Sequence, residues 1–213
     1  MNEEGPGEQQ GSVRRAARPY SIAVGVIFLA VLVFAGVNSL NTDPIGLEPG
    51  ARLPKFAAPS ATGHIDMDAN VDQDEACKVP AREAIRICDY FKRPLVIVAW
   101  FTKGCGTCRP QLDTVNAIRR RFRDVGFIGL DIQDSLDNAR KEVTEHRWGF
   151  PMALDRDGAV SGLYGIVVGP TLLFAYPGGV LMSKNLGELD QAELTRRVEA
   201  LVRGSRERAR RRG

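Results

Sequence analysis

The sequence predicts an α/β fold in which helices flank a central mixed β-sheet. Two continuous apolar runs, residues 95–101 and 127–132, have the length and composition of strands buried on both faces, and a helical pattern follows each. A third segment, residues 171–182, places two short apolar runs around a Pro-Gly-Gly turn, which predicts a hairpin before a last helix. Strand–helix–strand–helix followed by hairpin–helix is typical of an α/β sandwich with a mixed sheet.

The helices are predicted from apolar spacing and from capping residues. Apolar residues that recur at helical spacing through residue 123 follow the first strand, namely Leu112, Val115, Ile118 and Phe122. Ser135 is placed to cap a second helix that runs to about residue 147. Asp190, with Glu193 three residues later, forms a capping box that opens the last helix.

Length and composition limit the class of protein. The chain has 213 residues, enough for one globular domain with appendages, and 44% of them are hydrophobic, as in proteins with a packed core. The net charge of +3 is uneven, because residues 203–213 hold six arginines and one glutamate, which leaves about −2 for the rest. A nucleic-acid partner is not expected, since phosphate binding would need a cationic face on the body of the protein.

The N-terminal part predicts a membrane anchor. Residues 1–19 are polar and are expected to be a disordered cytoplasmic segment, whereas residues 20–40 carry no charge and are long enough to cross ~30 Å of hydrocarbon as a helix. Arginines precede this run and acids follow it, so the positive-inside rule places the N-terminus in the cytoplasm. We expect a single-pass protein of the plasma membrane with its main domain outside; a signal peptide cleaved after Ser39 is the alternative, and it exports the same domain.

Prolines, glycines and changes in charge divide the rest of the chain into segments. Residues 41–50 are expected to be a linker, 51–203 the folded domain and 204–213 a basic disordered tail, which is either solvated or in contact with anionic lipid. Residues 61–93 form an acidic insertion that holds Cys77 and Cys88.

A redox centre is predicted at Cys105-Gly106-Thr107-Cys108. The motif falls where a buried strand ends and a helix begins, and the free N–H groups and dipole of a helix N-terminus favour a thiolate there. Lys103 adds a positive charge, so we assign Cys105 as the attacking thiolate and Cys108 as the resolving thiol. Half of a zinc site and a purely structural disulfide are alternatives, although no second ligand pair has zinc spacing.

A second motif lies far away in the sequence. Gly169-Pro170 directly precedes the apolar strand that begins at Thr171, and a proline in this place often marks a cis peptide bond.

These two motifs resemble the thioredoxin superfamily, and within it the membrane-anchored, extracytoplasmic TlpA-like thiol-disulfide oxidoreductases of the redoxin type. The resemblance covers about residues 51–203 and is carried by Val-Ala-Trp-Phe-Thr-Lys-Gly-Cys-Gly-Thr-Cys-Arg, Tyr-Gly-Ile-Val-Val-Gly-Pro-Thr-Leu-Leu-Phe, Leu53-Pro-Lys-Phe-Ala-Ala-Pro59, residues 150–158 and residues 187–190. It implies a thioredoxin-like sandwich in which Pro170 is a cis-proline against the active disulfide and the backbone of Gly169 grips a substrate cysteine. With Gly169 we place the spacer residues Gly106 and Thr107 in substrate contact, and Trp100 in support as a core residue.

Several positions depart from the pattern of the relatives. Gly104 replaces the tryptophan that many of them carry before the first cysteine, and the spacer is Gly-Thr rather than Gly-Pro. The buried acids of the family are also missing, because Gln111 and Ala99 occupy their places. Asp113 is either a substitute acid or a solvated residue of the helix surface. The direction of electron flow therefore stays open between reductant, oxidant and isomerase.

Two features of the insertion have competing interpretations. Cys77 and Cys88 form either a structural disulfide or a second electron relay; we favour the structural disulfide, since the spacing forms no reactive turn. Asp66-Met-Asp68-Ala-Asn70 resembles the start of a calcium loop, but Val71 and Cys77 stand where glycine and glutamate are needed, so a solvated acidic loop is expected.

The expected activity is disulfide exchange with exported proteins, with no cofactor and no metal. Expected partners are exported protein thiols or disulfides and an upstream electron donor or acceptor in the membrane. A peroxiredoxin-like peroxidase is one alternative, because Thr102 stands three residues before Cys105, although Val98 replaces the required proline. A redox-inert or metal-carrying module, with His146 as its copper ligand, is another.

Overall fold

The computed structural model describes residues 24–27, 29, 46–82 and 84–211, and it divides the chain into two compact units, Met1–Ile45 and Gly46–Gly213. In the first unit the described residues are helical. None of the helices built from described residues has the length and apolarity needed to cross a membrane. The predicted polar segment 1–19, most of the predicted anchor 20–40 and residues 41–45 of the predicted linker lie outside the described residues.

The second unit is built on a five-stranded mixed sheet with the order β5-β4-β3-β6-β7. In sequence the strands are β3 (Leu95–Phe101), β4 (Gly126–Ile132), β5 (Met152–Asp155), β6 (Thr171–Tyr176) and β7 (Val180–Leu186). β3, β4 and β5 are mutually parallel, whereas β6 is antiparallel to both β3 and β7. This confirms the predicted mixed sheet, with β3 at its centre.

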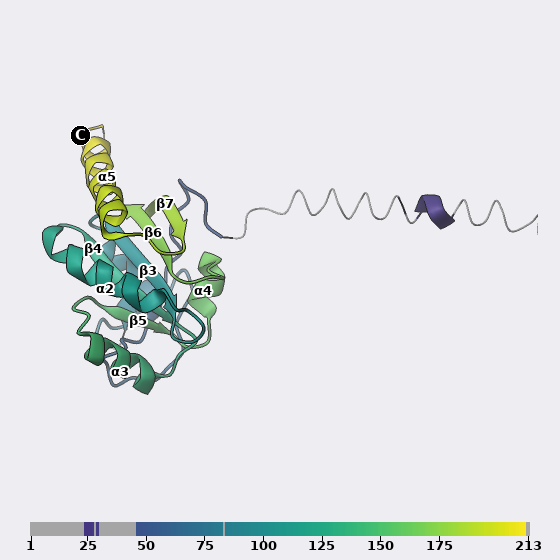
Figure 1. Cartoon of the computed structure of the whole chain (residues 1–213), viewed down its shortest axis with the longest axis horizontal. Helices are drawn as coiled ribbons and strands as arrows, with labels where there is room; N and C mark the ends of the chain where they lie inside the picture. Colours follow the sequence, from purple (N-terminus) through teal and green to yellow (C-terminus); the bar gives the residue numbers. More distant parts are fainter. Residues whose placement is uncertain (1–23, 28, 30–45, 83, 212–213) are drawn as a thin grey trace, which may run out of the picture. The chain divides into compact units, whose positions relative to one another are not determined.

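Helices cover both faces of this sheet (Figure 1). They are α2 (Cys108–Ile118), α3 (Leu136–His146), α4 (Ala159–Tyr164) and α5 (Gln191–Arg210). The chain also forms 3-10 turns at Ala76–Lys78, Ile87–Tyr90 and Arg119–Arg121, and a small antiparallel pair of β1 (Ala57–Ala58) with β2 (Ile85–Arg86).

The side chains of β3 point alternately to the two faces of the sheet, so the core has two halves. Val96, Val98 and Trp100 pack with the apolar stripes of α2, α3 and α5 on one face, whereas Leu95, Ile97 and Ala99 pack with α4 and the entry segment around Phe56 on the other. Successive strand side chains point to opposite faces, so one continuous apolar run fills both halves of the core.

The predicted caps are present. Ser135 Oγ accepts a hydrogen bond from the Asn138 N–H at 3.3 Å, and the carboxylate of Asp190 accepts one from the Glu193 N–H at 2.7 Å. Both side chains satisfy N–H groups that the first helical turn leaves without partners. α3 ends at Arg147, which takes a left-handed conformation with φ 54°.

Three predicted boundaries are wrong. Residues 46–50 belong to the folded unit rather than to a linker, since the Gly50 N–H donates to the Leu181 carbonyl at 2.8 Å. The tail is not disordered from residue 204, because α5 continues to Arg210. The first helix ends as an α-helix at Ile118 and continues as a 3-10 turn, which leaves Phe122 outside it.

A disulfide between Cys77 and Cys88, with Cα atoms 6.0 Å apart, ties the insertion together. Next to it the Arg86 guanidinium donates to the Val79 carbonyl at 3.1 Å and pairs with Asp89. Cys88 is partly buried against the core on the Phe56 side. This arrangement agrees with a structural disulfide, whose role stays a prediction.

The last turns of α5 are expected to contribute to stability. Ser205 is buried, and the Arg208 guanidinium lies 4.6 Å from the centre of the Tyr176 ring. Deleting residues 204–213 should therefore lower the free energy of unfolding by about 1–2 kcal/mol, measured by urea denaturation. Deleting residues 212–213 alone is the control, and an unchanged stability after the longer deletion would contradict the packed helix.

Candidate active site

The Cys105–Cys108 pair lies at the carboxyl end of β3, where the chain turns into α2. The two residues form a disulfide with Cα atoms 5.4 Å apart, and the Cys108 N–H donates to the Cys105 carbonyl at 3.4 Å. Cys108 is the first residue of α2 and is fully buried, whereas Cys105 is partly exposed. Cys105 is thus the more accessible residue of the pair; its role as the attacking cysteine stays a prediction.

Gly169 and Pro170 directly precede β6, the strand next to β3, and Gly169 lies close to the disulfide. The peptide bond between them is cis. A Cβ atom at Gly169 would lie 3.0 Å from the Cys108 sulfur and 2.8 Å from Cδ2 of Phe101, so a side chain does not fit here without displacing its neighbours. Glycine thus allows the backbone to approach the buried sulfur closely. The two distant motifs thus lie side by side, and the roles of Gly169 and Pro170 in substrate binding stay predictions.

The residues around the first cysteine are open to solvent. Lys103, Gly104, Gly106 and Thr107 are all exposed, and Gly104 has a φ of +76°, which favours glycine. Thr107 is the residue before α2, and its side chain makes no capping hydrogen bond. The structure thus places Lys103 and the spacer where a partner can reach them; their roles in binding stay predictions.

Trp100 is a core residue near the end of β3 that leads into the redox loop. It is fully buried, its Nε1–H donates to Met152 Sδ at 3.3 Å, and its ring meets the Trp148 ring edge to face at 5.3 Å. These contacts fix the end of β3 from which the redox loop leaves.

The two positions that the family pattern singled out are occupied differently. Gln111 is buried; its Oε1 accepts a hydrogen bond from the Leu189 N–H at 2.5 Å, and its Nε2 has no hydrogen-bond partner among the described residues. Asp113 accepts a hydrogen bond from Trp148 Nε1 at 2.7 Å and lies 3.3 Å from His146 Nδ1. Gln111 thus joins α2 to the loop before α5, and Asp113 joins it to the end of α3.

A buried acid that the sequence analysis missed stands on the strand beside the redox loop. Asp131 lies directly across from Trp100 in the β3–β4 ladder and is fully buried. Its Oδ1 is 3.2 Å from the Thr102 hydroxyl, and its Oδ2 has no hydrogen-bond partner among the described residues. The only signal in the sequence is one acid inside an otherwise apolar strand.

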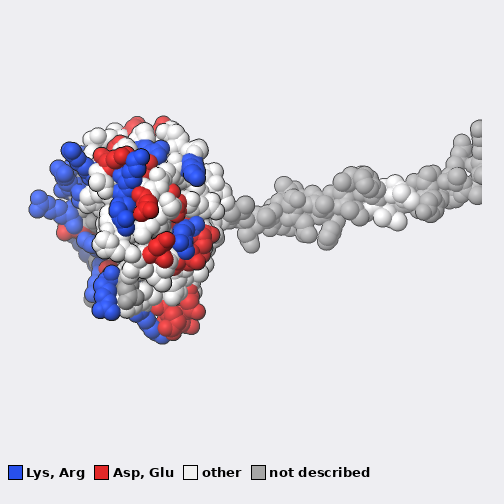
Figure 2. All heavy atoms as spheres, turned by 90° about the horizontal axis from the view of Figure 1, so that it is seen from below, with Lys and Arg blue, Asp and Glu red and all other residues white. Residues whose placement is uncertain are grey.

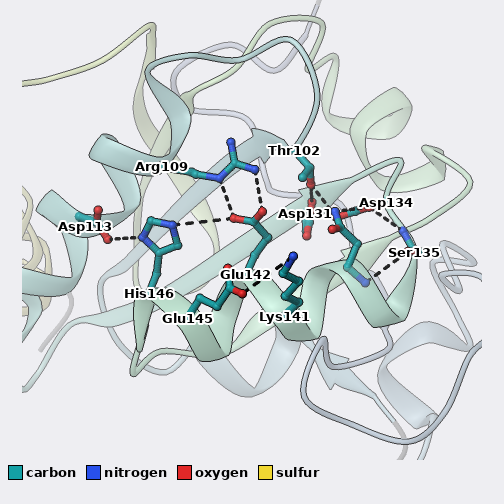
Figure 3. A network of polar contacts seen from close by, with 11 residues as sticks. Thr102, Arg109, Asp113, Asp131, Asp134, Ser135, Lys141, Glu142, Glu145 and His146 are labelled. Carbon is teal, nitrogen blue, oxygen red and sulfur yellow. Dashed lines mark hydrogen bonds and ion pairs between the residues drawn. The ribbon is translucent and has the colours of Figure 1, made fainter.

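Figure 3 shows Asp131 beside Thr102 and Asp134, with Arg109 and Glu142 nearby. The Thr102 hydroxyl donates to Asp134 Oδ2 at 2.6 Å, and the Asn138 amide donates to both Asp134 oxygens. Thr102 therefore fastens the start of the redox loop to the beginning of α3.

Burial disfavours the charged form of Asp131 and the Asp134 carboxylate disfavours a second negative charge, so together they raise the pKa of Asp131 to about 8; Glu142 acts in the same direction. The hydrogen bond from Thr102 acts in the opposite direction. Near neutral pH, Asp131 is therefore mainly a neutral carboxylic acid.

An ion pair connects the residue after Cys108 to α3. Arg109 donates two hydrogen bonds of 2.6 Å to the mostly buried carboxylate of Glu142, and His146 Nε2 lies 3.9 Å from the same carboxylate. The Arg109 guanidinium lowers the pKa of Glu142. Bidentate pairs of this kind fix orientation, so α2 is held in register with α3.

Among the described residues, no three His, Cys, Asp or Glu side chains are gathered as the ligands of a metal ion would be. The acids of the insertion, Asp66 and Asp68, are both paired with Arg156 at 2.8 Å. His146 stacks on the Trp148 ring at 4.7 Å.

Apolar side chains stand exposed next to the cis peptide bond. Val167 is 69% exposed, Val168 44% and Leu186 60%. Leu186 pairs with Thr171 across the β6–β7 ladder, so all three belong to the chain that surrounds Gly169 and Pro170. We call Val167, Val168 and Leu186 the apolar rim.

Comparison with known proteins agrees with this architecture. The model of the AhpC/TSA family matches residues 49–188. The thiol-disulfide oxidoreductase ResA of Bacillus thuringiensis subsp. konkukian is 23% identical over 106 residues, which are 49% of this chain and 61% of ResA. The chain thus spans about three fifths of the length of that relative.

Solved structures share the fold. MTB dsbF, in mixed oxidized and reduced forms, is 25% identical with a TM-score of 0.56 over 70% of this chain and 96% of its own. The peroxidoxin BcpB of Mycobacterium tuberculosis is 14% identical with a TM-score of 0.57 over 74% of this chain and 97% of its own. The second unit is therefore a thioredoxin-like fold.

Replacing Asp131 with Asn should remove a pH dependence of stability. The folded state keeps the proton of Asp131 up to about pH 8, whereas the unfolded state loses it near 3.8, so ionisation makes folding less favourable as pH rises between these values. Between pH 4 and pH 8, the free energy of unfolding of the native chain should fall by roughly 2–4 kcal/mol more than that of Asp131→Asn, measured by urea denaturation. Asp137→Asn, at an exposed acid on α3, is the matched control; equal pH profiles for the native chain and Asp131→Asn would show that Asp131 is ionised.

Proposed function

Because the chain belongs to the AhpC/TSA family and carries a disulfide next to Gly169, which precedes a cis-proline, we propose that it is a thiol-disulfide oxidoreductase with Cys105–Cys108 as its redox centre. The observation that carries the proposal is the asymmetry of the pair: Cys105 is accessible, Cys108 is buried, and the backbone of Gly169 lies against the buried sulfur. The names of ResA and dsbF are in keeping with it.

The proposed exchange runs through one mixed disulfide. In the reducing direction the Cys105 thiolate attacks one sulfur of a client disulfide, and the other client sulfur leaves as a thiolate. Cys108 then gives up its proton and attacks the Cys105 sulfur, which releases the second client thiol and leaves the Cys105–Cys108 disulfide. Two electrons pass from the dithiol to the client, and the oxidising direction is the same path in reverse.

The apolar rim suggests the kind of client. Exposed valines and a leucine beside the redox centre favour polypeptide segments with apolar residues next to their cysteine, because contact removes apolar surface from water on both sides. The free backbone of Gly169 adds main-chain hydrogen bonds, which serve any sequence. Incompletely folded exported proteins combine these properties, and they are the clients that we propose.

We also propose that the redox unit acts outside the cytoplasm, held at the plasma membrane by residues 20–40. The uncharged apolar run and the arginines before it support this location. A membrane protein that supplies or removes electrons would then restore the disulfide or dithiol after each exchange.

A peroxidase is the competing function, since the matched family and the fold of BcpB leave room for it. The hydroxyl of Thr102, the residue that suggested it, is engaged by Asp134 rather than free beside Cys105. The peroxidase would be favoured if the rate at which peroxide oxidises Cys105 to a sulfenic acid exceeded the rate at which the Cys105/Cys108 dithiol reduces insulin.

Replacing Cys108 with Ala should trap clients as mixed disulfides, because the thiol that resolves them is gone. Adducts that run as new bands on non-reducing gels and disappear with dithiothreitol are expected, and they should depend on Cys105. The double variant Cys77→Ala/Cys88→Ala, with the redox pair intact, should form no such adducts. Insulin reduction that persists after Cys105→Ser would overturn the proposal.

An acid in the apolar rim should weaken client binding. Val167→Asp places a charge where an apolar client segment would rest, and we expect the KM for insulin to rise roughly three- to tenfold with kcat nearly unchanged. Met67→Asp is the control, since Met67 is a comparable exposed apolar residue in the insertion. Equal KM values for Val167→Asp and the native chain would remove the rim from the binding site.

A further inference from the structure

A basic pocket lies at the opposite end of the sheet from the disulfide. It opens where β3 and β4 begin, around Gly126, which pairs with Leu95, whereas the redox loop leaves the other end of β3. Its volume is about 420 Å³. Four arginines and several aromatic rings line it, the principal ones being Arg93, Arg119, Arg120, Arg123, Tyr90 and Phe122.

The charges of this pocket are not balanced. None of its lining residues is an acid, and none of the four arginines forms an ion pair with another described residue. By contrast Arg86, Arg109, Arg156 and Arg197 all pair with carboxylates. The fold thus gathers four like charges in one hollow, where they repel one another and attract anions.

Two glycines make room for the guanidinium groups. A Cβ atom at Gly149 would collide with the Arg119 guanidinium, and one at Gly126 would lie 3.4 Å from Arg93 Nε and 3.2 Å from the Tyr90 ring. Asn116 Oδ1 fixes this arrangement, because it accepts hydrogen bonds from both Arg119 Nε at 2.9 Å and the Gly149 N–H at 3.0 Å. Arg119 is therefore positioned, half-buried, against the wall of the pocket.

Arg93 is oriented as well. Its guanidinium carbon lies 5.6 Å from the centre of the Tyr90 ring, a cation–π contact that leaves the N–H groups of the fork available to a ligand. An arginine fork matches the geometry of phosphate oxygens, and it binds them through two parallel hydrogen bonds.

We infer that this pocket binds a ligand with two or more phosphate charges. The size of the hollow, the surplus of four arginines and the pre-set positions of Arg93 and Arg119 together favour such a polyanion over a single carboxylate. The same chemistry is offered by a free diphosphate and by the phosphate headgroups of anionic lipids. The site is separate from the redox centre, and it does not depend on the proposed disulfide exchange.

Binding should stabilise the folded chain, because a polyanion relieves the repulsion among the arginines and binds only where they are gathered. With the full-length chain in neutral detergent, sodium pyrophosphate should raise the melting temperature and give a saturable calorimetric titration. Arg119→Ala should weaken the affinity about tenfold, the usual effect of losing a charge-assisted hydrogen bond.

A variant that keeps the net charge distinguishes binding at a defined site from non-specific attraction of anions to a basic surface. Gly149→Ala forces the Arg119 guanidinium out of its place and should weaken pyrophosphate binding at least threefold. Gly162→Ala is its control, since a Cβ there meets nothing within 4 Å. Arg206→Ala, which removes an exposed arginine of α5, is the control for Arg119→Ala.

A second experiment, with micelles that contain phosphatidylglycerol, shows whether the phosphate comes from a soluble ligand or from a lipid headgroup. Protection by pyrophosphate that Arg119→Ala weakens indicates a soluble ligand, and protection by the lipid alone that the same variant weakens indicates a headgroup. Either result supports the site. The inference is overturned if neither probe raises the melting temperature, or if Arg206→Ala weakens binding as much as Arg119→Ala.

Discussion

The site depends on one close approach, that of the Gly169–Pro170 backbone to the sulfur of Cys108. It is set by the antiparallel pairing of β6 with β3, which places Thr171 opposite Ala99 and so brings the residues before β6 to the end of the strand that carries the disulfide. The absence of a side chain at residue 169 allows this approach without displacing the neighbours, since a Cβ would lie 3.0 Å from the sulfur and 2.8 Å from Cδ2 of Phe101. The approach covers Cys108 and leaves Cys105 open, and this difference between the two sulfurs is the basis of the proposed exchange.

A polar network surrounds the redox loop, and it places a buried acid on the strand next to β3. Gln111 and Ala99 cannot titrate, but Asp131 stands on the next strand, buried and tied through Thr102 to the start of the redox loop. The Arg109–Glu142 pair then holds the helix that begins at Cys108 against α3.

Much of this fold follows from local patterns in the sequence. The strands at 95–101 and 127–132, the caps at Ser135 and Asp190 and the hairpin after Pro170 depend on short-range apolar spacing and capping chemistry, and all are present. The strand β5 and helix α4 are too short to show periodicity. The extension of α5 was missed because its arginines suggest solvation, while a ring contact with Tyr176 holds the helix. Asp131 and the basic pocket arise from side chains that only the tertiary structure brings together.

The two cysteines have different proposed roles, with Cys105 as the attacking thiol and Cys108 as the resolving thiol. Alkylation distinguishes these roles. After mild reduction that opens Cys105–Cys108, limiting iodoacetamide followed by peptide mass spectrometry measures the rate at each cysteine. We expect Cys105 to react at least tenfold faster than Cys108, because Cys105 is partly exposed whereas Cys108 is fully buried. Equal rates at the two cysteines, or faster modification of Cys108, would contradict it.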